Sequence, residues 1–188
     1  MATNKIYPVD ITGKGKQLIR AKVDETGLET VRRTMGQDTF LVSPINGDFV
    51  DLNTCLTYIV EQGVLLNGHD ITILHDSGIY IDGYLYDHDL SNIRSLTIIG
   101  CNGTTFYRDV NILNEELFKF KNTDVKIYNI KFDTNSTNNI SAIVTNTNNW
   151  IIENCQFDNF VCGITMQSDT ISLQISNNIF NCKTFGIE

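Results

Sequence analysis

The sequence predicts an all-β fold built as a solenoid, in which short strands stack as successive coils. The first observation is an eight-residue phrase written three times: VKIYNIKF at Val125–Phe132, WIIENCQF at Trp150–Phe157 and LQISNNIF at Leu173–Phe180. The starts lie 25 and 23 residues apart, a period typical of solenoid repeats. A second observation is the short strand-like segment that follows each copy: Ser141–Val144, Gly163–Met166 and Gly186–Ile187.

Each phrase has apolar residues at its first and third positions, Asn at the fifth and Phe at the eighth. In the first copy, Val125 and Ile127 alternate with other residues at the period of a strand with one buried face. Phe132 breaks this alternation, so we expect a bend near Asn129, whose side chain tolerates left-handed backbone. The asparagines should then stack about 4.8 Å apart as a structural ladder with buried, hydrogen-bonded amides. Its members are Asn129, Asn154 and Asn177.

Two weaker copies of the phrase precede these three. They are Ile71–Gly78 and Leu96–Gly103, with His75 and Gly100 at the Asn position. The interval of 29 residues before the Val125 copy predicts an enlarged turn within Phe106–Lys121. A leucine-rich repeat has a similar period, but its Asn stands at another spacing, and the intervening segments here lack helical periodicity.

An amphipathic helix is predicted ahead of the repeats, over Asp51–Gln62. Leu52, Leu56 and Ile59 share one face of it, and Asp51 can act as its N-cap. Such a helix would cap the open end of the first coil.

The repeats, together with a helix followed by the extended segment Ile71–Tyr80, resemble the pectate-lyase-like superfamily. The resemblance covers about residues 49–188 and implies a right-handed parallel β-helix, the architecture of many bacteriophage tailspikes. We therefore divide the chain into residues 1–47, an N-terminal segment, and residues 48–188, a capping helix with the first coils of a β-helix. The resemblance implies that residues 1–47 form the adaptor to other virion proteins. Glu188 lies two residues into a strand, so we expect the front part of a longer protein.

Composition narrows the range of partners. The net charge is −8, and residues 48–188 carry seven Lys and Arg against seventeen Asp and Glu, which argues against a nucleic-acid ligand. No run of about 18 apolar residues and no signal peptide is seen, so we expect no membrane association. The five cysteines are expected to be buried thiols rather than disulfides or metal ligands. They are Cys55, Cys101, Cys155, Cys162 and Cys182.

Asp133 and Asp158 are the candidate catalytic pair, because each follows the phrase Phe in successive copies. Stacked coils would place their carboxyls about 5 Å apart, the separation of a retaining glycosidase pair. The same pair could hold Ca²⁺, although no cofactor is otherwise indicated. The alternative is an ordinary polar turn position of the repeat. Pectate lyases use an arginine base, and neither Arg94 nor Arg108 stands at a matching repeat position.

A second candidate site is the segment YLYDHD, which we expect on a turn. Tyrosine rings stack on sugars and carboxylates accept hydrogen bonds from sugar hydroxyls, so the segment is a candidate carbohydrate contact, with a solvated loop as the alternative. Its candidate residues are Tyr84, Tyr86, Asp87 and Asp89. His75 falls at a bend and is expected to hydrogen-bond the backbone.

The resemblance implies a phage virion protein, the tailspike or tail-fibre component that attaches the receptor-binding part to the particle and contacts a host surface polysaccharide. A homotrimer is expected, and outward-facing Ile151 and Ile179 would suit a subunit interface. The alternatives are a polysaccharide depolymerase of the same fold, either glycosidase or lyase, and a structural particle component such as a head fibre.

Overall fold

The computed structural model describes residues 18–21, 28–31, 38–62, 66–82, 86–109, 116–135, 140–146 and 149–188. For residues 18–21, 28–31, 81–82 and 86–87 it describes the backbone alone. The chain divides into two compact units, Met1–Gln37 and Asp38–Glu188. In the first unit, β1 (Leu18–Ala21) and β2 (Leu28–Val31) pair antiparallel. None of the described helices is both long and apolar enough to cross a membrane.

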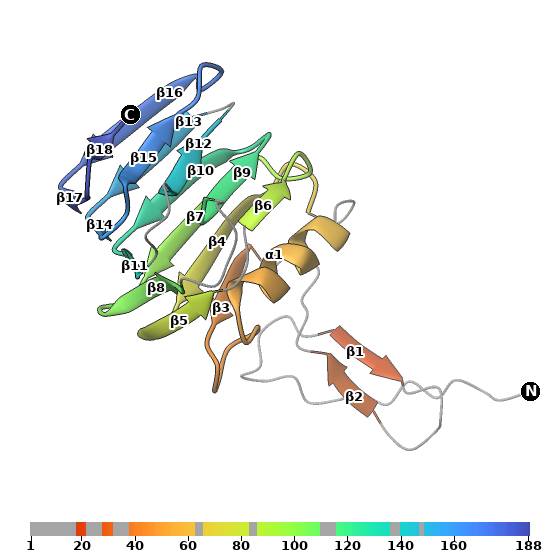
Figure 1. Cartoon of the computed structure of the whole chain (residues 1–188). Helices are drawn as coiled ribbons and strands as arrows, with labels where there is room; N and C mark the ends of the chain where they lie inside the picture. Colours follow the sequence, from red (N-terminus) through yellow and green to blue (C-terminus); the bar gives the residue numbers. More distant parts are fainter. Residues whose placement is uncertain are drawn as a thin grey trace, which may run out of the picture. The chain divides into compact units, whose positions relative to one another are not determined.

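The second unit is a stack of coils whose strands form three parallel sheets (Figure 1). Sheet 1 contains β3 (Thr39–Val42), β4 (Asp70–His75), β7 (Ser95–Gly100), β10 (Asp124–Tyr128), β13 (Asn149–Glu153) and β16 (Ser172–Ser176). Sheet 2 contains β5 (Gly78–Asp82), β8 (Thr104–Arg108), β11 (Lys131–Thr134), β14 (Gln156–Asp158) and β17 (Ile179–Asn181). Sheet 3 contains β6 (Tyr86–Asp89), β9 (Phe118–Lys121), β12 (Ser141–Thr145), β15 (Cys162–Met166) and β18 (Phe185–Ile187). The predicted all-β parallel solenoid is confirmed.

The register of sheet 1 matches the alignment of the five phrases. Val125 pairs with Leu96 on one side and with Trp150 on the other, and the pairing continues to Ile71 and Leu173. All five phrase starts therefore lie in one column. The short segments after the three strong copies form β12, β15 and β18 of sheet 3, as expected. The predicted enlarged turn in Phe106–Lys121 contains β9, and its residues 110–115 lie outside the described part of the chain.

The phrase phenylalanines stack along the inside of sheet 2. Phe132 and Phe157 lie with ring centroids 5.1 Å apart at an interplanar angle of 9°, and Phe157 and Phe180 repeat this at 5.0 Å and 6°. Phe106 continues the stack in the opposite direction, 6.1 Å from Phe132. Each ring thus covers the next, and burial of apolar surface along this column stabilises the contact between coils.

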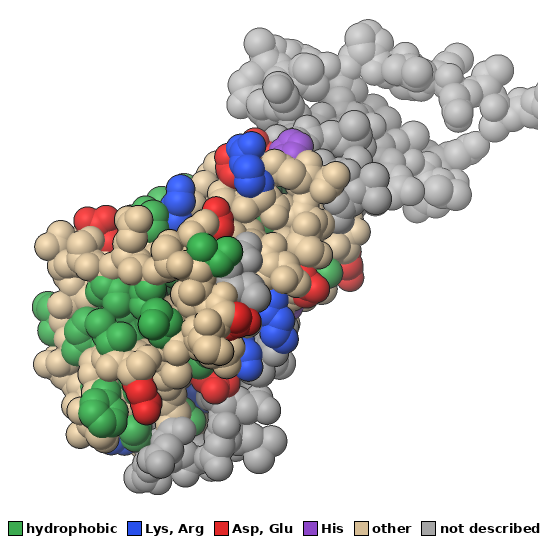
Figure 2. Space-filling view, turned by 90° about the horizontal axis from the view of Figure 1, so that it is seen from above, with side chains coloured by type: hydrophobic (Ala, Val, Ile, Leu, Met, Phe, Trp, Pro, Cys, Tyr) green, Lys and Arg blue, Asp and Glu red, His purple; other side chains and the backbone are tan. Residues whose placement is uncertain are grey.

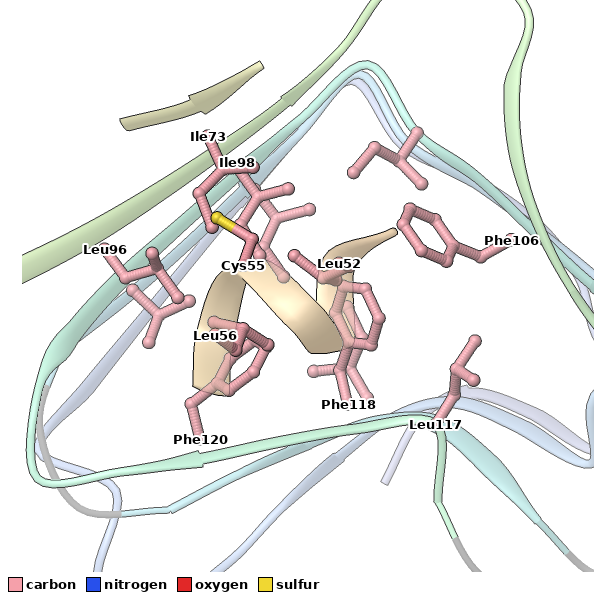
Figure 3. Packing of buried hydrophobic residues seen from close by; sticks show 14 of the residues in the cluster. Leu52, Cys55, Leu56, Ile73, Leu96, Ile98, Phe106, Leu117, Phe118 and Phe120 are labelled. Carbon is pink, nitrogen blue, oxygen red and sulfur yellow. The ribbon is translucent and has the colours of Figure 1, made fainter. Parts of the chain in front are cut away.

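The predicted helix is confirmed as α1 (Leu52–Glu61), and the Asp51 Oδ1 atom accepts a hydrogen bond from the Thr54 backbone N–H at 2.7 Å. The helix buries its apolar face because Leu52, Cys55 and Leu56 point into the core among side chains of the sheets (Figure 3). Residues 38–47, which the sequence assigns to the N-terminal segment, contribute β3 to the solenoid, where it pairs with β4.

The bends after β10, β13 and β16 are made by asparagines in left-handed backbone. The φ angles are 58° at Asn129 and 54° at both Asn154 and Asn177. The coils are linked here through the backbone, since the Asn129 N–H donates to Glu153 O and the Asn154 N–H donates to Ser176 O. The three side chains are exposed rather than buried, so the expectation of a buried amide ladder is corrected. Left-handed backbone turns the side chain out at the corner.

Two further expectations are corrected. Cys101 is exposed, whereas Cys55, Cys155 and Cys162 are buried and Cys182 is partly buried; all five thiols are free. His75 points into the core, and neither ring nitrogen has a hydrogen-bond partner. The ring instead makes edge contacts with Tyr80 and Phe106, at centroid distances of 4.7 and 4.9 Å.

The coil formed by β16, β17 and β18 is less covered than the coils beside it, because these are the edge strands of their sheets. Phe185 on β18 is 51% exposed, whereas Cys162, its register partner one coil earlier on β15, is 2% exposed. Figure 2 looks onto this end of the stack and shows hydrophobic side chains gathered there.

Candidate functional site

The outward side chains of β8, β11 and β14 form a polar face, which we call the sheet 2 surface. It consists of Thr105, Tyr107, Lys131, Asp133, Gln156 and Asp158. They point outward because they alternate with Phe106, Phe132 and Phe157, which are buried. The parallel register places Tyr107 beside Asp133 and Asp133 beside Asp158, so an aromatic ring and two carboxylates follow one another along the solenoid axis.

Lys131 joins the two predicted carboxylates. Its Nζ atom lies 3.1 Å from Asp133 Oδ2 and 2.9 Å from Asp158 Oδ2. The sequence therefore brings Asp133 and Asp158 together on neighbouring strands as expected, but a cation from β11 lies between them.

Every oxygen of this carboxylate pair has a hydrogen-bond partner. Asp133 Oδ1 accepts from Asn159 Nδ2 and from the Thr134 N–H, both at 2.8 Å. Asp158 Oδ1 accepts from Asn181 Nδ2 at 2.8 Å, and its Oδ2 accepts from Gln156 Nε2 at 2.8 Å. The carboxylates are thus held in fixed orientations by neighbouring coils.

The electrostatics around Asp158 favour its ionised state. Partial burial raises the pKa of Asp158, but hydrogen bonds from Lys131, Asn181 and Gln156 outweigh it and leave the pKa below its ordinary value. The hydrogen bond to Asp158 in turn raises the pKa of Lys131. A glycosidase general acid needs a raised pKa, so Asp158 is better suited to accept hydrogen bonds than to donate a proton.

Two shallow hollows flank the sheet 2 surface. One, of about 490 Å³, lies at the corner between sheets 1 and 2; its lining includes Asn102, Thr105, Asn129, Lys131, Asn154 and Gln156. The other, of about 390 Å³, is lined by Tyr107, Asp133, Thr134, Asn135, Asn159 and Lys183. Amides and hydroxyls dominate both linings, and the charged groups among them are Lys131 in the first hollow and Asp133 and Lys183 in the second.

The turn between β7 and β8 is longer than the equivalent turns of the later coils, and it forms one wall of the first hollow. Three residues, Cys101–Gly103, separate these strands, whereas two separate β10 from β11 and β13 from β14. Gly100 lets the coils approach at this corner, since a Cβ atom there would lie 2.5 Å from the backbone oxygen of Asn129. The exposed amides of Asn129 and Asn154 face the same hollow.

The structure describes only part of the second predicted site, the YLYDHD segment. Tyr84 lies outside the described residues, and Tyr86 and Asp87 belong to β6, so the expected turn is a strand over Tyr86–Asp89. Asp89 is exposed; its Oδ1 accepts from the Ser91 N–H and from Asn122 Nδ2, each at 3.0 Å. The hydrogen bond from Asn122 is the main reason that the pKa of Asp89 is lowered. Nothing described brings these residues to the sheet 2 surface.

Sequence reasoning missed Tyr107, Lys131 and Gln156 as members of the site. A signal was available, since residues on either side of each phrase Phe must face outward on the same strand. Neither solenoid arginine joins them: Arg108 is buried and donates to Glu116 O at 3.0 Å, and Arg94 pairs with Asp70.

Within the part of the chain that the structure describes, no group of three or more His, Cys, Asp or Glu side chains has the arrangement of a metal site. Comparisons of the chain with protein-family models, with curated proteins and with solved structures gave no match.

Proposed function

We propose that this chain is a structural and glycan-binding component of a phage virion, a tailspike or tail-fibre protein whose solenoid contacts a host surface polysaccharide through the sheet 2 surface. The observation that carries the proposal is the column of Tyr107, Asp133 and Asp158, in which an aromatic ring stands in register beside two fixed carboxylates. A tyrosine face packs on a sugar ring, and ionised carboxylates accept hydrogen bonds from sugar hydroxyls.

The shape and charge of the surface support binding of a chain-like neutral ligand. Neighbouring strands lie about 4.8 Å apart, so equivalent polar groups recur along the axis at a spacing close to that of sugar units. The two hollows are open and shallow, and their linings are largely amides and hydroxyls. Because the hydrogen bonds of Asp133 and Asp158 hold both groups in place, little side-chain ordering is left to oppose binding.

The rest of the chain has a structural role in this proposal. The helix α1 acts as the cap of the first coil, which suits the burial of Leu52, Cys55 and Leu56 in the core. Residues 1–47 attach the chain to other virion proteins, and three copies associate into a homotrimer.

Binding of purified bacterial capsular polysaccharides and lipopolysaccharide O-chains to the 188-residue chain, measured by glycan array and then by calorimetry, tests the proposal. Tyr107→Ala should weaken binding by at least about tenfold, because aromatic anchors dominate such contacts. Lys131→Ala should also weaken binding, since the two carboxylates lose the cation that orients them.

Lys119→Ala is the matched control, because Lys119 faces outward on β9 in sheet 3. It should leave affinity unchanged. Loss of binding in Lys119→Ala equal to that in Lys131→Ala would contradict a site on sheet 2, and the absence of any bound glycan across a broad panel would contradict the function.

Cleavage is the matching test of the depolymerase alternative. With Asp158 held ionised, we expect the chain to release neither reducing ends nor unsaturated sugars from a polysaccharide that it binds. If the wild-type chain released such sugars and Asp158→Asn did not, the protein would be a depolymerase rather than a binding protein.

A further inference from the structure

We infer that the end of the solenoid formed by β16, β17 and β18 is a docking surface for one further polypeptide coil, which adds parallel to these strands and carries the apolar pattern of the phrase. The inference does not depend on the glycan contact. It concerns the inward side chains of this last coil, which we call the end face. They are Leu173, Ile175, Phe180, Phe185 and Ile187.

The end face is exposed at positions that are buried in the preceding coil. Phe185 is 51% exposed and Ile187 is 46% exposed, and the other three members are partly buried. Figure 2 shows hydrophobic side chains gathered at this end of the stack. Contiguous exposed apolar surface of this kind marks an interaction site. The register partners one coil earlier are at most 2% exposed, and they are Trp150, Ile152, Phe157, Cys162 and Ile164.

The stack of phenylalanines indicates what the end face can receive. Phe157 is covered on both sides, by Phe132 at 5.1 Å and by Phe180 at 5.0 Å between ring centroids. Within the described residues, Phe180 stacks on Phe157 from one side only. A parallel coil with a phenylalanine at the same position of its phrase would cover the other face of Phe180 with the same geometry.

The backbone of the last coil leaves room for such a ring. A Cβ atom at Gly163 would lie 2.8 Å from the Gly186 O atom and 2.8 Å from the Phe180 Cδ1 atom, so glycine makes space there for the ring of the next coil. Gly186 stands at the equivalent position of the last coil, because β15 and β18 pair in parallel register on both sides of it. The end face therefore presents the same bare backbone to a further aromatic ring.

The main chain of the last coil continues a pattern of hydrogen bonds between coils. At the corner between sheets 1 and 2, the Asn129 N–H donates to Glu153 O on the next coil. The Asn154 N–H donates to Ser176 O in the same way. Asn177 has the same left-handed backbone and carries the equivalent N–H at the open edge. An extended segment that adds to a sheet edge gains main-chain hydrogen bonds, while its alternate side chains supply specificity.

The end face of a second copy does not meet these requirements. Two identical faces meet about a two-fold axis, which makes the strands of one copy antiparallel to those of the other. A rotation that places sheet 1 on sheet 1 also places sheet 2 on sheet 3, so the Phe180 rings would not stack. Only a coil that runs in the same direction keeps the phenylalanines in line and continues the interface that already joins the coils.

Hydrogen exchange of the chain extended after Glu188 by a second copy of residues 166–188 tests the inference. This segment has 23 residues, the interval between register partners of β14 and β17 and of β15 and β18, so each added residue falls one coil beyond its original. The Asn177 amide hydrogen should exchange at least about tenfold more slowly than in the 188-residue chain, because an edge strand becomes an interior one.

The matched control is an extension of the same length that carries Ile175→Ser and Phe180→Ser in the added copy only. It should leave the exchange rate of the Asn177 amide at its original value, since the added segment then has no apolar side to pack on the end face. The amides of β10 lie in an interior strand and should exchange equally slowly in all three chains, which shows that the solenoid is intact.

Three results would overturn the inference. The first is an exchange rate that the intact extension leaves unchanged. Equal protection by both extensions is the second, because any covering segment would then serve. The third is self-association of the 188-residue chain in sedimentation equilibrium that Phe185→Asp abolishes, which would mean that a second copy occupies the end face.

Discussion

Sheets 1 and 2 are made by the same coils, and each directs a column of apolar side chains inward, yet their outer faces differ. The outer face of sheet 1 carries a column of half-buried side chains, Leu41, Leu74, Ile99 and Tyr128. The outer face of sheet 2 instead carries Tyr107 and a hydrogen-bonded carboxylate pair. The inward positions must repeat because each coil packs on the next. The outward positions are free of that requirement, so neighbouring faces of one stack can acquire different partners.

The largest expected effect is at an inward position. Phe157→Ala removes a buried ring that stacks on Phe132 and on Phe180, and should lower the free energy of unfolding by about 3–5 kcal/mol. Chemical denaturation measures this loss. Phe185→Ala is the control, because that ring is 51% exposed, and should cost far less. Equal losses would mean that the stack of phenylalanines does not stabilise the coils.

The second-largest expected effect on stability comes from His75, at the corner between sheets 1 and 2. Burial lowers the pKa of His75 from 6.5 to about 4. The unfolded chain binds this proton more readily than the folded chain, so stability is full above pH 6.5 and falls as the pH drops toward 4. The loss amounts to about 3 kcal/mol.

Denaturation across this pH window checks the effect in the wild type and in His75→Leu, which should lose the corresponding slope. A slope that persists in His75→Leu would show that another group titrates.

A smaller effect is expected at the asparagine of the same corner. Asn154 has a φ of 54°, so Asn154→Ala should cost roughly 1 kcal/mol through backbone strain alone, and Asn154→Gly should be close to neutral. Thermal denaturation distinguishes the two substitutions. Asn102→Ala, at an exposed turn, serves as the control. If alanine and glycine were equally costly at position 154, the amide rather than the backbone would be responsible.

The smallest effect on stability should come from the outer face of sheet 2. Lys131→Ala removes a partly exposed ion pair and should change the free energy of unfolding by less than about 1 kcal/mol. The same substitution should raise the pKa of Asp158, which an NMR titration of its carboxyl carbon follows. Lys119→Ala should leave that pKa unchanged. If the pKa of Asp158 were unaltered in Lys131→Ala, Lys131 would not form an ion pair with this carboxylate in solution.

The elements that repeat were predictable from the sequence. Alternation fixed which residues of each phrase face inward, and the break before Phe132 located the bend at Asn129. The same alternation should have placed His75 inside, because it follows Ile71 and Ile73 at intervals of two. The short strand β3 was missed because TFLV offers too few positions to show a period.

The candidate site was only half predictable. Spacing placed Asp133 beside Asp158, since the repeat sets the register of neighbouring strands. The bridge from Lys131 could not be derived, because it depends on the rotamers of a long side chain that reaches from one coil to the next. The exposure of the Asn129 amide followed from the left-handed backbone, which reverses the direction that strand alternation alone assigns.

Because the register is continuous from β4 to β16, a whole coil is the unit that can be inserted or deleted in this protein without disturbing the packing. Removing one residue from a strand would turn every later side chain of that strand to the opposite face. Removing residues 125–149 would instead bring the phrase at Trp150 directly onto the one at Leu96, with the phenylalanines still in line. A lineage can therefore lengthen or shorten such a stack in steps of about 4.8 Å. The length of the solenoid can then change without redesign of the packing inside.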